Sequence, residues 1–348
     1  MSDAEVRTEG LRGQRPGREA VPGAKGGHGE RGRGRGKRRG EASMVPDADF
    51  TSYYGRPIIK EPTWKALDIA GYLFLGGLAG ASSVLAAGAH ATGRDRLATA
   101  SKVGALGAIS LSTAALIHDL GRPERFANML RVLKPTSPMS VGSWILFAYG
   151  PAAGLAAITG VTGMAPGAGR AATGWAALTG SAVATYTGVL FADTAIPAWH
   201  GAYRELPFLF AGSAAAAAGG LGLLLAPRAE NDLARGTAAF GAALDLCAGH
   251  LMRRRLGPLA EPYEQGKAGR LMRTAEILTA VGAGAGLLAG GRAGRRGRAA
   301  AAIAGAALLA GSAATRFAVF EAGRASAADP KYVIISQRSQ PRSGQDTP

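Results

Sequence analysis

The chain of 348 residues contains very few of the residues that ligate redox centres or form disulfides, with one cysteine and five histidines. The single cysteine, Cys247, excludes an intramolecular disulfide and a cysteine-ligated iron–sulfur cluster within the chain. A di-haem cytochrome b needs facing pairs of histidines, and no two histidines lie in one apolar segment at haem-binding spacing. We therefore expect no haem, no iron–sulfur cluster and no metal site in this chain.

Long apolar segments dominate the rest of the sequence. A bilayer core requires roughly 20 mostly apolar residues per helix, and eight segments of about that length follow one another between residues 66 and 320. They cover residues 66–89, 99–118, 141–164, 171–196, 206–226, 233–251, 274–291 and 299–320. The segments are apolar almost all round, whereas a helix of a soluble domain has a polar face. The predicted fold is an all-α polytopic membrane protein with eight transmembrane helices, arranged as two four-helix bundles.

Small residues replace the large apolar ones in these segments. Aromatic residues make up only 6% of the chain, whereas it contains 53 glycines. Small residues at four-residue spacing let helix backbones approach closely in lipid. Three such pairs are candidate packing seams: Gly76 with Gly80, Gly180 with Ala184, and Gly282 with Gly286.

The segments outside the apolar region are basic. Residues 1–43 form an Arg/Gly-rich stretch that should be disordered, and a solvated tail that sets membrane topology is favoured over one that binds nucleic acid. Residues 44–65 form a pre-membrane segment, residues 66–320 the transmembrane domain, and residues 321–348 a polar C-terminal tail; translation from Met44 is an alternative.

The distribution of positive charge predicts the orientation. Eight spans place both termini on one side of the membrane, which we call side A, together with loops two, four and six; the other is side B. Side A carries 29 of the 40 Lys and Arg residues and side B carries ten. By the positive-inside rule both termini are cytoplasmic, and the chain is expected in the plasma membrane of a bacterium.

Ionisable residues within the spans are costly unless they are paired or hydrated, so each is a candidate functional residue. Four lie at one depth near side A: Asp68, Tyr72, His118 and Asp119. Three more lie in spans six to eight: Asp245, Glu276 and Arg316. The half near side B has little beyond His90, which favours a pocket that opens toward side A.

The loop after the second span carries the most specific motif of the chain. It reads Asp-Leu-Gly-Arg-Pro-Glu-Arg over residues 119–125, and the third span is entered through Ser-Pro-Met-Ser-Val-Gly-Ser-Trp over residues 137–144. Here the chain resembles the NrfD/polysulfide-reductase family of membrane subunits. The glycines of residues 76–80, Pro-Ala-Trp at 197–199 and residues 205–210 agree with this resemblance, which covers roughly residues 50–325.

The resemblance implies a quinone-reactive subunit of a respiratory oxidoreductase rather than a stand-alone enzyme. Such a subunit exchanges electrons between menaquinone or another quinone and an iron–sulfur partner of the four-cluster, ferredoxin-like type, which a molybdopterin-type catalytic subunit serves. Quinone chemistry needs groups that hydrogen-bond carbonyl oxygens and exchange protons. The four polar residues near side A are the candidates for this role.

Partner docking and proton movement have candidates of their own. The basic residues of loop two would dock the iron–sulfur subunit at side A, in the cytoplasm: Arg122, Arg125, Arg131 and Lys134. Asp245, Glu276 and Arg316 form a candidate proton path within the membrane.

Several alternatives remain open at this level. The polar residues near side A could scaffold the docking surface instead of touching quinone. The chain could be a purely structural anchor, a transporter, or an anchor with a single haem between His118 and His250.

Overall fold

The computed structural model describes residues 58–60, 62, 64–120, 128–290 and 294–338. Every regular element within these ranges is a helix. In chain order the helices are α1 (Ala66–Ala91), α2 (Asp95–Asp119), α4 (Pro138–Thr162), α5 (Pro166–Ala192), α6 (Pro197–Gly201), α7 (Leu206–Leu225), the 3-10 helix η2 (Arg228–Glu230), α8 (Asn231–Leu256), the 3-10 helix η3 (Gly257–Ala260), α9 (Glu261–Glu264), α10 (Gly266–Ala289), α11 (Gly294–Ala328) and α12 (Pro330–Arg338). Residues 1–43 and most of the pre-membrane segment lie outside the described residues.

Seven helices in the described part of the chain are long and apolar enough to cross a membrane: α1, α2, α4, α5, α7, α10 and α11. Each coincides with a predicted span, with ends that differ by a few residues in most cases. Proline at the first or second position sets the start of α4, α5 and α7, where its missing N–H is not needed. The all-α fold and the membrane-protein class are therefore confirmed.

The sixth predicted span, residues 233–251, lies in α8 but is not among these seven helices. At 26 residues α8 is long enough to cross a bilayer. Its apolar run is interrupted by Arg235 and Asp245 and ends in three arginines at residues 253–255. These charges explain why length and composition do not identify α8 as a membrane helix.

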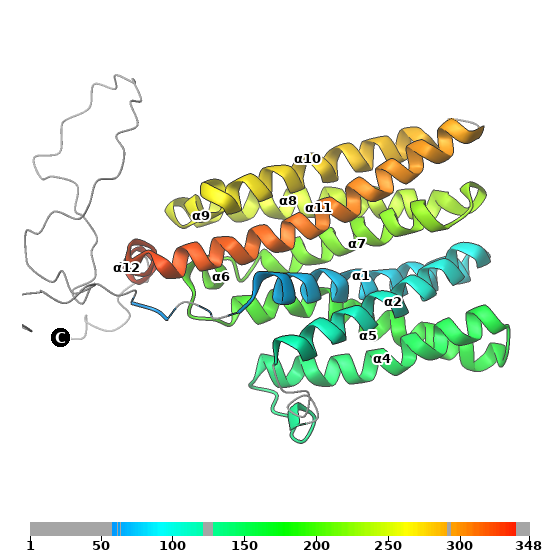
Figure 1. Ribbon diagram of the computed structural model, residues 1–348, viewed down its shortest axis with the longest axis horizontal. Helices are drawn as coiled ribbons and strands as arrows, with labels where there is room; N and C mark the ends of the chain where they lie inside the picture. The colour runs from blue at the N-terminus through cyan, green and yellow to red at the C-terminus, as the bar shows by residue number, and fades with distance from the viewer. Residues whose placement is uncertain (1–57, 61, 63, 121–127, 291–293, 339–348) are drawn as a thin grey trace, which may run out of the picture.

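The long helices run nearly parallel to one another, in two groups (Figure 1). In the first group, α1 and α4 both pack against α2 and against α5. In the second group, α7 and α10 both pack against α8 and against α11. The groups meet where α7 contacts α1 and α5, and where α11 contacts α1.

Helices α1 and α5 approach so closely that their contact requires glycine. A Cβ atom added to Gly80 would lie 2.2 Å from the carbonyl oxygen of Gly180, and one added to Gly180 would lie 2.8 Å from that of Gly80. Real Cβ contacts essentially never fall below 3.0 Å. Two of the glycines predicted to form packing seams thus meet directly across this contact.

The short helices α6, α9 and α12 lie together at the side A end of the molecule (Figure 1). Trp199 of α6 is fully buried, and its indole N–H donates to the carbonyl of Val319 at 2.7 Å. Its ring stacks on Phe191 with 4.2 Å between the centroids. It packs against Gly323, where a Cβ atom would lie 1.9 Å from the ring. Residues 321–328, expected to start a polar tail, therefore belong to a packed helix.

An ion pair holds helix α12 at the side A end of the molecule. The Lys331 ammonium donates to the Glu261 carboxylate at 2.5 Å. This hydrogen bond holds the pKa of Glu261 below its usual 4.5. The C-terminal part of the described chain is thereby held against α9.

Candidate functional site

A histidine and an aspartate from neighbouring helices pair at side A. Asp68 lies in the first turn of α1 and His118 in the last turn of α2, which are the favourable ends for an acidic and a basic side chain. The His118 Nδ1 and the Asp68 Oδ2 lie 3.0 Å apart. The Asp68 side chain is 12% exposed, whereas that of His118 is 67% exposed. The pair thus connects a largely buried carboxylate to an imidazole that can exchange protons with its surroundings.

A cavity of about 210 Å³ lies beside this pair, between α1, α2, α4 and α5. Most of its wall is apolar, including the ring systems of Trp64 and Phe191. Polar side chains enter it from all four helices: Tyr72, Ser112, Asp119, Ser143, Tyr186 and Thr187. A mostly apolar cavity with a few convergent polar groups is the usual form of a small-molecule site.

The four residues predicted to act together near side A divide between these two features. Tyr72 and Asp119 line the cavity, whereas Asp68 and His118 form the pair beside it. Asp68 and Tyr72 are four residues apart on α1, yet only one of them lines the cavity. The Tyr72 hydroxyl makes no hydrogen bond with any residue that the structure describes, which leaves its O–H group available to a ligand.

Four of the six polar cavity residues were not found by sequence reasoning: Ser112, Ser143, Tyr186 and Thr187. The Tyr186 hydroxyl of α5 donates to the carbonyl of Pro138, which ties α5 to the start of α4. The Ser112 hydroxyl of α2 donates to the Tyr72 carbonyl at 2.9 Å and ties α2 to α1. The signal for Tyr186 was its position as the single tyrosine of the predicted span 171–196. Nothing comparable marked Ser112.

Two of the four docking candidates, Arg122 and Arg125, lie outside the described residues. Arg131 and Lys134 are exposed at side A. The Lys134 backbone N–H donates to the Ser140 hydroxyl, which in turn donates to the Val132 carbonyl, both at 3.0 Å. These bonds fold the loop onto the start of α4. Exposed basic and apolar side chains therefore lie together close to Met139, which lines the cavity.

The three candidates for a proton path are not joined by hydrogen bonds. Glu276 pairs with Arg253 instead. Arg316 is fully buried, donates to the Phe210 carbonyl at 2.8 Å and lies 3.8 Å from the centroid of the Phe210 ring. Asp245 is 4% exposed, and its Oδ1 has no hydrogen-bond partner among the described residues. The Nε and Nη1 atoms of Arg316 lack partners within the same residues.

Metal ligands do not cluster in the described ranges: no group of three or more His, Cys, Asp or Glu side chains there is placed to hold a metal ion. Cys247 is exposed on α8.

The chain matches the family described as polysulphide reductase, NrfD, over residues 60–238. The match covers just over half of the chain. The chain belongs to the NrfD family. This confirms the membership that the motif after the second span indicates. No curated protein matches the chain.

The family match includes one set of candidate residues of this NrfD protein and leaves out another. It runs from the start of α1 into α8, so it includes the cavity and the pair of Asp68 with His118. Asp245, Glu276 and Arg316 all lie beyond residue 238 and outside the match. The candidate ligand site is thus within the part of the chain that defines the family.

Proposed function

We propose that this NrfD protein is the quinone-reactive subunit of a membrane oxidoreductase. The observation that carries the proposal is the cavity between α1, α2, α4 and α5, into which Tyr72 and Asp119 project. A quinone has an apolar ring and two carbonyl oxygens. Apolar walls with a free hydroxyl and a carboxylate suit such a molecule, because they bury the ring and offer hydrogen bonds to its oxygens.

The pair beside the cavity supplies the protons that quinone chemistry needs. Reduction of a quinone to a quinol takes up two protons along with two electrons. Asp119 lines the cavity next to His118 in the sequence, and His118 is bonded to Asp68. In the proposed mechanism, Tyr72 orients the quinone and Asp119 transfers protons to or from it. His118 exchanges protons with the aqueous phase at side A.

The proposed assembly has the partner subunit at side A, the end of the molecule where the cavity lies. The chain spans the membrane eight times, with α8 as the sixth span, and its two helix groups form two four-helix bundles. Packing against α7 and α10, with the ion pair between Arg253 and Glu276 of α10, lets α8 lie in the membrane. Both termini are cytoplasmic, in a bacterial plasma membrane. A four-cluster iron–sulfur subunit docks on the basic loop at side A and links the quinone to a molybdopterin-type catalytic subunit.

Substitutions in the assembled complex test the quinone site. Asp119→Asn removes the proton-exchanging carboxylate at constant size, and His118→Ala removes its outlet. Asp193→Asn is the matched control. Asp193 is an exposed carboxylate at the same end of the molecule, and it does not line the cavity. Quinone turnover should fall by about 10²-fold or more in the first two variants and stay unchanged in the control.

Assembly is measured in parallel by co-purification of the partner subunits. Normal quinone turnover in both Asp119→Asn and His118→Ala would reject the proposed site. Lost assembly with normal turnover in the assembled fraction would instead assign these residues to a structural anchor.

A further inference from the structure

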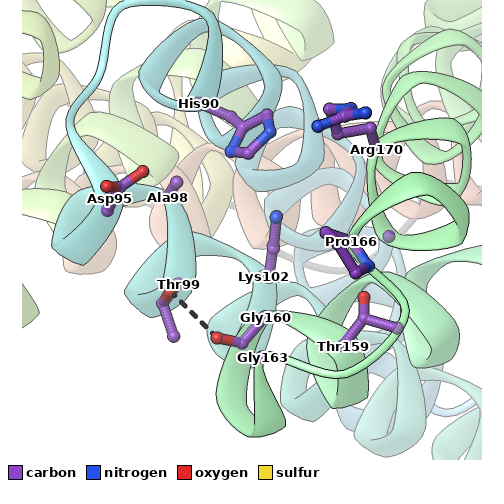
Figure 2. Close-up of a pocket in the computed structure, with 11 residues that line it drawn as sticks. His90, Asp95, Ala98, Thr99, Lys102, Thr159, Gly160, Gly163, Pro166 and Arg170 are labelled. Atoms are coloured by element: carbon purple, nitrogen blue, oxygen red, sulfur yellow. Dashed lines mark hydrogen bonds between the residues drawn. The ribbon is translucent and has the colours of Figure 1, made fainter.

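A second cavity lies at the opposite end of the same four helices, at side B. Its volume is about 200 Å³, and it forms where α1 and α4 end and where α2 and α5 begin. Three basic side chains line it, His90, Lys102 and Arg170, with a single carboxylate from Asp95. Figure 2 shows the Lys102 amine directed into the space between His90 and Arg170. The cavity is therefore lined by more positive than negative charge.

Lys102 is the unusual member of this group. Its residue is only 7% exposed, yet its ammonium makes no hydrogen bond or ion pair with any residue that the structure describes. Its methylene chain packs against Gly160, where a Cβ atom would lie 3.1 Å from the Lys102 Cδ. A buried charge without a partner is costly, and such charges in membrane proteins are usually paired or hydrated. The Asp95 carboxylate lines the same cavity and attracts this ammonium, but it forms no hydrogen bond or ion pair with it.

The start of α5 adds to the positive potential. Pro166, the first residue of α5, lines the cavity, and the N-cap residue Ala165 provides no side-chain cap. The N-terminal end of a helix carries partial positive charge that favours anions nearby. This helix end and the Lys102 ammonium therefore face the same space.

We propose that this cavity binds a phosphate group, with Lys102 as its principal contact and Arg170 and His90 at its rim. Lys102 lies seven residues into α2, about 10 Å from the start of the helix. That depth is close to the boundary between the headgroups and the hydrocarbon core. The exposed apolar residues Ile158 and Val161 flank Gly160 on α4. The phosphate can therefore come from an anionic phospholipid of the side B leaflet, or from phosphate in solution.

The test uses purified full-length protein, stripped of lipid in a neutral detergent, with phosphatidylglycerol and inorganic phosphate as separate probes. Lys102→Met removes the ammonium and keeps the length of the side chain. Arg96→Met is the matched control, because Arg96 is an exposed cation at the start of the same helix that does not line the cavity. Bound lipid is counted by native mass spectrometry, and stability is followed as the midpoint of thermal unfolding.

Lys102→Met should weaken binding of the active probe by at least about tenfold, which corresponds to one lost charge-assisted hydrogen bond. Arg96→Met should bind as the wild type does. Without either probe, Lys102→Met should unfold at the same temperature as the wild type or a higher one, because a buried charge has been removed. Binding of phosphatidylglycerol that phosphate does not displace identifies a lipid site, whereas stabilisation by phosphate alone identifies a solute site.

Equal binding of both probes by the wild type and Lys102→Met would overturn the proposal. A loss of stability in Lys102→Met that is equally large with and without the probes would overturn it too, because Lys102 would then have a purely structural role. Neither result bears on the quinone cavity, which lies at the other end of the four helices.

Discussion

The contact between α1 and α5 gives a sharp prediction, because it depends on the absence of two side chains. In Gly80→Ala the new Cβ would lie 2.2 Å from the Gly180 carbonyl oxygen, whereas contacts below 3.0 Å essentially never occur. The two backbones must therefore separate by about 1 Å, which loses close contacts on both helices. Overpacking of this kind costs about 1–3 kcal/mol. The midpoint of thermal unfolding should fall by several degrees, at roughly 2–4 °C per kcal/mol.

Gly71→Ala is the matched control on the same helix, because a Cβ at Gly71 meets nothing within 4 Å. Both variants gain about 1 kcal/mol of helix propensity, so their difference isolates the contact with α5. Gly80→Ala should also weaken binding of a quinone analogue, because α1 carries Tyr72 and α5 carries Tyr186. Equal unfolding midpoints in the two variants would refute the reasoning.

Three further predictions concern the rest of the molecule. Arg316→Met should destabilise the protein by about 1–3 kcal/mol, because it leaves the buried Phe210 carbonyl without its donor and removes a positive charge that attracts the buried Asp245. Adding Asp245→Asn should recover part of the loss, and an additive double variant would contradict the coupling. The folded-state pKa of Glu261 is lowered, so its ion pair with Lys331 stabilises the docking of α12 above the unfolded pKa of 4.5. This stabilisation is lost as the pH falls through the folded-state pKa. A spin label on α12 should become more mobile over that pH range, and in Glu261→Gln it should be mobile at every pH. With Cys247 replaced by alanine, a cysteine at Ser137 should react with an impermeant thiol reagent only after the membrane is opened, and reaction in intact cells would reverse the proposed orientation.

The sequence was sufficient for the membrane helices, because a long apolar run has few alternatives in a chain of this composition. It also identified the family, because the motif at residues 119–125 is long and specific. The sequence does not decide whether α8 crosses the membrane, because its arginines and Asp245 lower the apolar character of a helix that is long enough to do so. Whether such a helix enters the membrane depends on neighbours that can shield its charges.

The sequence predicted the membrane depth of the site residues, but not what each side chain contacts. Spacing along one helix placed Asp68 and Tyr72 on a common face, yet the position of α2 decides that Asp68 meets His118 while Tyr72 lines the cavity. Lys102 lies within the predicted span 99–118, but it was not among the candidate residues. Its lack of a hydrogen bond or ion pair is a property of the packed helices, because it depends on which residues α4 and α5 place around it.

The length of α11 has a consequence for any subunit that docks at side A. Its 35 residues extend about 52 Å at 1.5 Å per residue, which exceeds the 40–45 Å of a whole bilayer with its headgroups. Phe320, Gly323 and Ala327 pack tightly near the end of this helix. A helix of this length that stands along the membrane normal extends beyond the headgroups, and its end near Phe320 packs against α6. A docked redox centre would be held at a fixed distance from the cavity by protein, independently of fluctuations in the thickness of the membrane.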